Sequence, residues 1–457
     1  MAHLRDAIRS QNILLFLLLS ACSVIALLVS NDPRTPWIFA AGLCGAAIAY
    51  FLFQRPLTTL YIALFLHLTP TGIRLDDRIF DPIVHLTTAL ALASWLSNTV
   101  AHRQRITWNT ICVITALYMS WGIVSLLWAP DIVEGRKKLV AYAIGFLLIF
   151  LISNQVKSLR ALDGLMRVLR INAWIIVIGG IYAALFANYT LGERLKVLNM
   201  NENALGMVML LMLPGVIWPV FRSDGVKRQF MWAASIAYVL CTIVLVALSG
   251  SRGSTIALVI VLLTFAFSRL TRPWGMIGVF IVIGTLMGAP FLEGGLTKRF
   301  MEGEGGNLGG RAELWDASRL LIYDYPLTGA GIGNGAALLP QYVQEVSNDP
   351  YKLGRATYPS HNPILEASTD TGLPGMSIYL CLYASAVTQF FRSRRRACSR
   401  EKELVPYFNI MLGVALGFLI AAMKSGGLEA QPTLFLLLAL LVIPAQFPYK
   451  ARASETL

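Results

Sequence analysis

The stretch ALGMVMLLMLPGVIWPVF, residues 204–221, contains no charged residue. An α-helix needs roughly 20 predominantly apolar residues to cross the hydrocarbon core of a bilayer, so this stretch predicts a transmembrane helix. Similar stretches follow one another along almost the whole chain of 457 residues. Because only 14% of the residues are charged, against about 25% in soluble domains, we expect lipid rather than water around most of the fold.

Fourteen stretches in the sequence are candidate spans. They are Ile13–Ser30, Trp37–Phe53, Leu57–Pro70, Ile83–Val100, Trp108–Trp128, Leu139–Ile152, Ile171–Ala187, Ala204–Phe221, Met231–Gly250, Ser254–Ser268, Trp274–Leu292, Leu373–Phe391, Tyr407–Met423 and Pro432–Phe447. Leu57–Pro70 and Leu139–Ile152 are short enough to be half-spans, so we expect twelve to fourteen spans and an even number. Ile13–Ser30 lacks a small-residue cleavage site and is interpreted as the first membrane anchor.

The net charge of +13 is explained by topology rather than by nucleic-acid binding. When the N-terminus is placed in the cytoplasm, basic residues gather in the cytoplasmic loops, as the positive-inside rule requires. They are Arg5, Arg9, Arg103, Arg105, Lys157, Arg160, Arg222, Lys227, Arg228, Arg269, Arg272, Arg392, Arg394, Arg395, Arg396, Arg400 and Lys402. Both termini are then cytoplasmic. Five of the six cysteines lie in apolar spans, so no disulfide framework or thiolate metal site is expected.

One long loop is the largest segment outside the membrane. The spans divide the chain into residues 1–292 as the first part of the bundle, 293–372 as a large outer loop and 373–457 as the last spans with a cytoplasmic tail. Inside the loop, the apolar spacing of residues 311–325 predicts a short helix with Leu314, Ala317, Leu321 and Tyr325 on one face. The fold class is therefore all-α, a polytopic helix bundle with short helices in one loop.

His361 is the histidine of this outer loop. Asn362 and Pro363 follow it and predict a helix start, with Asn362 as the N-cap and Pro363 at the first helical position. The N-terminal end of a helix carries partial positive charge, which disfavours the imidazolium form of a nearby histidine. We therefore expect His361 to be neutral near pH 7 and able to accept a proton.

Arginines on the same outer side form a second group. Arg194, Arg252 and Arg311 lie in or beside glycine-rich turns, and Arg299 and Arg355 are weaker members. A guanidinium retained on this side can contact a lipid headgroup, form an internal ion pair or bind an anionic ligand. Arg252, within the turn SGSRG of residues 249–253, combines a guanidinium with hydroxyls and bare amides suited to phosphate oxygens.

Asp76 and Asp77 are the competing site in the outer loop after the third span. Paired carboxylates could act as a base or as metal ligands, but Arg74 and Arg78 flank them and favour internal ion pairs. Two carboxylates alone are also too few for a metal site, so we predict no metal at this pair.

The segment HNPILEASTDTGLPG, residues 361–375, resembles the signature of bacterial O-antigen ligases and related O-linked oligosaccharyltransferases. That signature is His-Asn/Ser, a nine-residue gap and Gly-x-x-Gly. The segments SGSRG (249–253), GRAELW (310–315) and PLTGAGIG (326–333) resemble other landmarks of the same superfamily, which also contains O-antigen polymerases. The resemblance covers the chain from about residue 199 to residue 375.

This resemblance implies a glycosyltransferase-C-like fold in the bacterial inner membrane, with its active site facing the periplasm. It implies transfer of O-antigen from undecaprenyl diphosphate to a lipid A core hydroxyl, with inversion and without a metal, a nucleotide or another cofactor. His361 would be the general base, and Arg194, Arg252 and Arg311 would bind the diphosphate. The expected partners are the lipid-linked donor, the lipid A core acceptor and membrane lipids.

Two alternatives remain open. The first is a polymerase of the same superfamily, whose acceptor is another lipid-linked repeat. The second is a polysaccharide transporter or flippase, which the composition alone would also fit. Transporters place charged groups near the bilayer midplane, whereas the candidate residues here lie in outer loops, which favours an enzyme.

Overall fold

The computed structural model describes residues 45–70, 77–186, 194–288, 311–346, 357–423 and 432–447. Within these ranges every regular element is a helix, which confirms the all-α prediction. The helices are α3 (Pro56–Leu68), α4 (Asp77–Ala101), α5 (Thr110–Ser125), α6 (Ile132–Gln155), α7 (Leu159–Phe186), α8 (Glu202–Phe221), α9 (Gly225–Leu248), α10 (Arg252–Phe267), α11 (Arg272–Gly288), α13 (Arg311–Asp324), α14 (Gly335–Val346), α15 (Pro363–Arg400), η3 (Lys402–Leu404), α16 (Val405–Ala422), α17 (Pro432–Val442) and η5 (Ile443–Gln446).

The predicted spans agree with these helices. Each span predicted between Leu57 and Phe447 overlaps a helix, whereas Ile13–Ser30 lies outside the described residues. Six described helices are long and apolar enough to cross a membrane. They are Phe80–Ala101, Ile132–Gln155, Leu159–Phe186, Glu202–Phe221, Gly225–Leu248 and Lys402–Ala422. The stretch Leu139–Ile152, a possible half-span by sequence, belongs to the 24-residue helix α6, which is long enough to cross.

Helix α8 is a buried helix in the described bundle. It packs against α7, α9, α10 and α16, and it is apolar all around its circumference, as expected for a helix enclosed by others. Two glycines allow its close contacts: Gly206 lies against Ser254 of α10, and Gly215 lies against the backbone of α7 at Met166 and Arg170. Small residues of this kind let helix backbones approach one another in membrane bundles.

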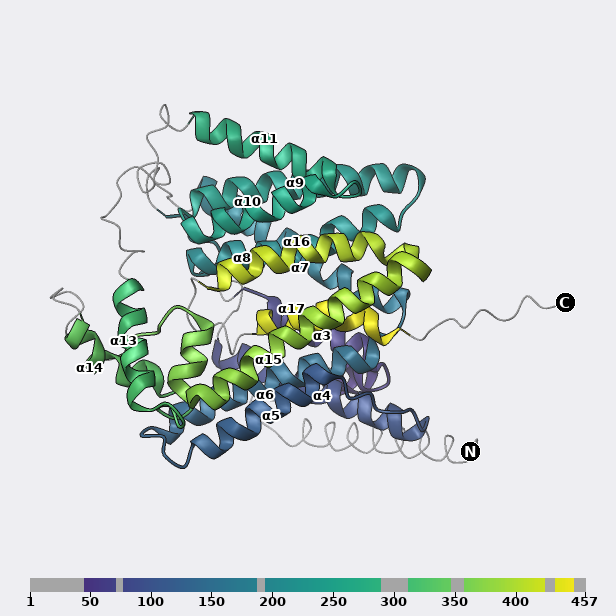
Figure 1. Ribbon diagram of the computed structural model, residues 1–457. Helices are drawn as coiled ribbons and strands as arrows, with labels where there is room; N and C mark the ends of the chain where they lie inside the picture. Colours follow the sequence, from purple (N-terminus) through teal and green to yellow (C-terminus); the bar gives the residue numbers. More distant parts are fainter. Residues whose placement is uncertain are drawn as a thin grey trace, which may run out of the picture.

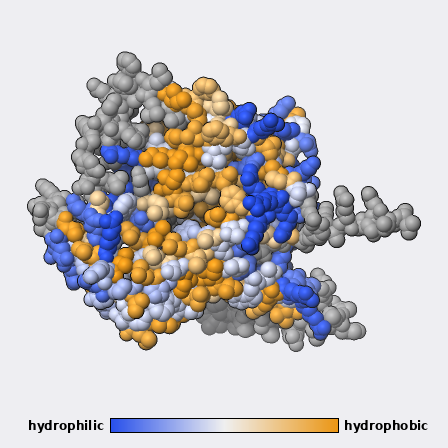
Figure 2. All heavy atoms as spheres, in the orientation of Figure 1, coloured by the Kyte–Doolittle hydropathy of each residue, from blue (hydrophilic) through white to orange (hydrophobic). Residues whose placement is uncertain are grey.

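The outward surface of the bundle is apolar. Ile178, Leu185, Val244, Phe267 and Phe280 are large hydrophobic residues with exposed side chains. Figure 2 shows a hydrophobic band across the face in view, with hydrophilic residues gathered toward the two ends of the bundle. A continuous apolar surface of this extent matches a lipid environment.

The two ends of the bundle differ. Helices α13 and α14 lie together at one end, next to the start of α15 (Figure 1). At the other end of α15, Arg392, Arg395 and Arg396 are exposed. On α13, Leu314, Ala317 and Leu321 are buried as predicted, but the assignment of Tyr325 to that face is wrong. The helix ends at Asp324. The amide of Tyr325 still donates to the carbonyl of Leu321, but its own carbonyl accepts from Gly329 N in the following turn, and its side chain is exposed.

Helix α15 is broken at Gly372, where φ is 67° and ψ is −174°. The break frees the backbone amide of Leu373, which donates to the carbonyl of Pro326 at 2.8 Å. A Cβ at Gly372 would stand 2.7 Å from the backbone of Leu327, so both the positive φ and the close approach require glycine. The break falls at the predicted boundary between the outer loop and the last spans.

The contact between α7 and α8 gives a test of the packing. A Cβ at Gly215 would lie 2.7 Å from the backbone atoms Met166 O and Arg170 N, whereas nothing lies within 4 Å of one at Gly284. We expect Gly215→Ala to destabilise the bundle by about 1–3 kcal/mol, as overpacking does. Gly284→Ala, the matched control in α11, should leave stability unchanged or slightly raised. Thermal unfolding in detergent measures both, and equal melting temperatures would contradict the described helix contact.

Candidate active site

His361 is held in a strained backbone conformation at the start of α15. Its φ is 53°, a left-handed value that is uncommon for a residue with a side chain. On one side, the carbonyl of Ser360 accepts a hydrogen bond from Trp315 Nε1 of α13 at 3.0 Å. On the other side, Asn362 caps α15 as predicted, its Oδ1 accepting from the amides of Ile364 and Leu365 at 3.0 and 3.3 Å. These contacts fix the backbone on both sides of His361.

The surroundings of His361 favour its neutral form. The imidazole is half-buried, and burial lowers its pKa below the ordinary value of 6.5. The positive charge of Arg311, at the start of α13, lowers that pKa further. At neutral pH the ring is therefore uncharged and can accept a proton.

Arg311 is in turn coupled to Arg194. Burial lowers the pKa of Arg311, and the charge of Arg194 adds to the effect. The structure thus brings together three of the residues that the sequence predicts for the site, from three separate segments. The described cluster is cationic at neutral pH, because both guanidinium groups remain charged while His361 does not.

Arg194 is oriented by several partners. Its Nε donates to the carbonyl of Ser249 at 3.1 Å, and its Nη2 donates to Asn203 Oδ1 at 3.2 Å. Its Nη1 lies 3.6 Å from the carboxylate of Glu202. Asn203 also accepts a hydrogen bond from Ser251 Oγ at 2.9 Å, so one amide oxygen links the loop before α8 to the turn before α10.

Arg252 is the first residue of α10 and is half-buried. Ser251 caps that helix by accepting from the amide of Ser254. Arg252 is therefore the residue directly after Ser251 in the chain. Ser251 and Arg194 both donate a hydrogen bond to the side-chain oxygen of Asn203. Sequence reasoning predicted Arg194 and Arg252 as separate candidates, and the shared partner Asn203 connects their segments.

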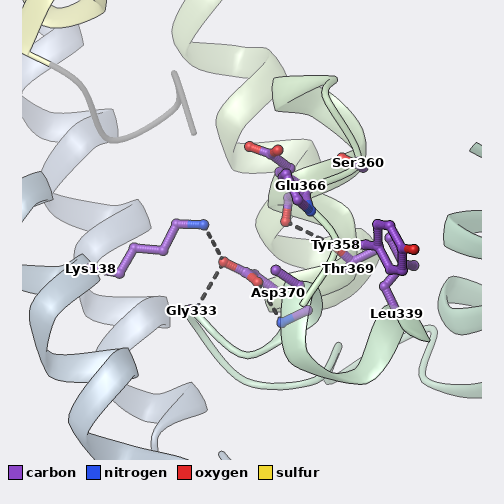
Figure 3. A pocket seen from close by; sticks show the side chains of 11 residues that line it. Lys138, Gly333, Leu339, Tyr358, Ser360, Glu366, Thr369 and Asp370 are labelled. Carbon is purple, nitrogen blue, oxygen red and sulfur yellow. Dashed lines mark hydrogen bonds and ion pairs between the residues drawn. The ribbon is translucent and has the colours of Figure 1, made fainter. Parts of the chain in front are cut away.

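Asp370 and Lys138 are central residues that the sequence did not indicate. Lys138 Nζ lies 2.8 Å from Asp370 Oδ2. The same carboxylate accepts from the amides of Gly333 and Gly335, both at 2.9 Å (Figure 3). Lys138 could have been noticed in the run RKK of residues 136–138, which places three basic residues on the predicted outer side against the positive-inside rule.

A pocket of about 120 Å³ lies beside this ion pair (Figure 3). Lys138, Gly333, Gly335, Ala336, Leu339, Tyr358, Pro359, Ser360, Glu366, Thr369 and Asp370 line it. Its wall includes Ser360, the neighbour of His361, so the pocket adjoins the backbone of the predicted catalytic residue. The side chains of the competing pair Asp76 and Asp77, and the weaker candidates Arg299 and Arg355, lie outside the described residues.

The electrostatic coupling between Arg311 and His361 can be measured directly. Modification of His361 by diethyl pyrocarbonate requires the neutral ring, and peptide mass spectrometry can follow it as a function of pH. We expect a midpoint below 6.5 in the wild type, because burial and the charge of Arg311 both disfavour the imidazolium. Arg311→Gln should move that midpoint upward. A midpoint at or above 6.5 in the wild type, or no change in the variant, would contradict the described environment.

Part of the chain matches a known protein family. Residues 236–380 match the family model described as O-Antigen ligase. The match contains Arg252, Arg311, His361 and Asp370 and leaves out Arg194. No curated protein matches the chain at a significant level. The resemblance found in the motifs is thereby confirmed, and residues 236–380 form a domain of the O-antigen ligase superfamily.

Proposed function

We propose that this protein is an O-antigen ligase that transfers O-antigen from undecaprenyl diphosphate to a hydroxyl of a lipid A core sugar. The family match supports the broader activity of the O-antigen ligases and polymerases, and the apolar helices support a multi-pass membrane protein. Within that class, the donor, the acceptor and the residue roles below are our proposal.

The observation that carries the proposal is the grouping of His361, Arg311 and Arg194. A neutral imidazole near Arg311, which is itself near Arg194, combines a proton acceptor with charges that suit a diphosphate. Arginine binds phosphate oxygens through a planar set of donors and remains charged even when partly buried. Asn203, Glu202 and the Ser249 carbonyl orient Arg194 in advance, which lowers the reorganisation needed on binding.

The proposed reaction is a direct displacement. His361 accepts the proton of the acceptor hydroxyl while the oxygen of that hydroxyl attacks the anomeric carbon of the donor glycan. The bond between that carbon and the diphosphate oxygen breaks, and undecaprenyl diphosphate leaves with the bonding electrons. Arg194, Arg252 and Arg311 stabilise the negative charge that develops on the leaving group. A single displacement inverts the anomeric configuration.

We assign the site to the periplasmic side of the inner membrane. It lies at the end of the bundle that carries α13 and α14, and the exposed Arg392, Arg395 and Arg396 are at the opposite end of α15 (Figure 1). The positive-inside rule places such a basic cluster in the cytoplasm. The opposite end of the helix, where the site lies, then faces the periplasm.

Replacement of His361 tests the general-base role. In a Gram-negative strain lacking its own ligase, His361→Ala should abolish O-antigen capping of the lipid A core on a lipopolysaccharide gel. Loss of a general base costs about 100- to 10,000-fold in rate. The control His102→Ala changes an exposed histidine at the far end of α4 and should cap normally. Undiminished capping by His361→Ala at equal protein level would rule out the assignment.

The phenotype of a strain lacking this chain separates ligase from polymerase. Loss of a ligase leaves bare core together with unligated polymer on the lipid carrier. Loss of a polymerase leaves core capped with single repeats. The second pattern would replace our proposal with the polymerase, whose acceptor is a lipid-linked repeat.

We also expect ligation by purified protein to be insensitive to EDTA. The proposed chemistry uses arginines where other enzymes use a divalent cation to neutralise the diphosphate. A two-lipid assay with defined donor and acceptor measures this without an ion gradient. Loss of turnover in EDTA with recovery on adding a divalent ion would favour Asp76 and Asp77 instead, and a requirement for an ion gradient would favour a transporter.

A further inference from the structure

The first part of α15 is mechanically separate from the rest of that helix. We call residues 363–371 the α15 head; it begins directly after His361 and Asn362 and ends at the break in Gly372. Because the helical backbone is interrupted at Gly372, the part of α15 that follows the break does not by itself fix the direction of the head. Contacts made by the head must do so.

Asp370 provides the most concentrated of these contacts. Its side chain is only 4% exposed and meets the ammonium group of Lys138 in α6 and two backbone amides, that of Gly333 in the turn before α14 and that of Gly335 at the first residue of α14. An isolated buried carboxylate is costly, whereas one with a cationic partner and several hydrogen bonds is tolerated. The head is therefore stable in the orientation in which Asp370 reaches all three donors.

The turn that supplies the amides is shaped for this contact. Gly333 has a φ of 78°, and a Cβ there would stand 2.9 Å from the carbonyl oxygen of Glu134 in α6. A Cβ at Gly335 would stand 2.8 Å from Asp370 Oδ1. Successive amides exposed in this way form an anion-binding concavity, and here an internal carboxylate fills it. The glycine-rich stretch 329–335 thus binds α15 itself.

We propose that Asp370 is a positioning residue for His361: through Lys138, Gly333 and Gly335 it fixes the α15 head, and with it the imidazole, against α6 and α14. The proposal rests on the general-base function proposed for His361. Additional contacts tie the same junction together, including Ala330 N to Thr369 O at 2.8 Å and Trp121 Nε1 to Thr371 O at 2.9 Å.

The geometry makes His361 sensitive to this contact. Asp370 lies seven positions after Pro363, which corresponds to about 10 Å along the helix axis. A tilt of roughly 10° about Asp370 therefore displaces the start of the helix by about 2 Å. A misplacement of about 1 Å in a reacting group can reduce turnover by on the order of 100-fold.

The experiment compares Asp370→Asn with a matched control, Asp163→Asn, in the full-length protein. Asp163 also bonds a partner from another helix, Trp218 Nε1 at 2.7 Å, but it lies with Arg222 and Glu403 at the opposite end of the bundle. We expect Asp370→Asn to lower kcat by on the order of 100-fold while KM for the donor is unchanged. In the pH profile of kcat, the acidic limb of the variant should move upward toward pH 6.5. The reason is that the pKa of His361 rises when the imidazole is less buried and farther from Arg311. Asp163→Asn should change neither.

A purely structural role of Asp370 predicts a different result. In that case turnover would fall only in proportion to the folded fraction, and the acidic limb would remain where the wild type has it, which would overturn the proposal. If Asp370→Asn does not fold, Lys138→Gln replaces it, since this variant keeps both amide contacts to Asp370. Lys138→Gln should also shift the acidic limb of the pH profile upward, with a smaller fall in kcat. An acidic limb at the wild-type position would again overturn the proposal.

Diethyl pyrocarbonate modification separates this proposal from the proposed function, because it reports on His361 without turnover. An upward shift of the His361 midpoint in Asp370→Asn supports the positioning role even if His361→Ala retains ligation, a result that would remove only the general-base assignment. An unshifted midpoint together with inactive His361→Ala removes the positioning role and leaves the general base in place.

Discussion

Backbone hydrogen bonding is the constraint on which the rest of the structure depends. In hydrocarbon an amide without a protein partner costs several kcal/mol, so a lipid-embedded chain must pair its backbone groups internally, as its helices do here, and an interrupted helix must be satisfied from another segment. The interruption at Gly372 shows the consequence, because the freed amide of Leu373 donates to Pro326. Once α15 is tied to that turn, the direction of its first residues is set by the loop and not by the part of the helix that follows Gly372.

Charge pairing organises the same region. Glu202 and Asn203 hold Arg194, and Asp370 is satisfied by Lys138 and two amides. In the same region the charge of Arg194 acts on Arg311, and the charge of Arg311 disfavours the imidazolium form of His361. Under the proposed function, the cost of keeping like charges together is offset when a diphosphate binds among them.

The sequence predicts most of the helices because their signals are local. Apolar stretches of membrane-spanning length mark the spans, and Asn362 followed by Pro363 marks the start of α15. The errors in the helix boundaries predicted from the sequence also have local causes. Apolar periodicity extended the helix of residues 311–325 by one residue, because Tyr325 continues the spacing although its backbone has already entered a turn. The predicted span Leu139–Ile152 leaves out the charged first turns of α6, because hydropathy does not detect a polar helix end.

The sequence by itself determined the all-helical membrane fold, the helix start after His361 and the family to which the motifs point. The tertiary structure decided which residues meet. Arg194, Arg311 and His361 come from three segments, and Lys138 reaches Asp370 from a helix far away in the chain. Helix propensity and capping depend on neighbours within a few positions, whereas an ion pair between remote helices depends on how the bundle packs. For that reason Asp370, unremarkable within the sequence ASTDTG, became central only in the folded chain.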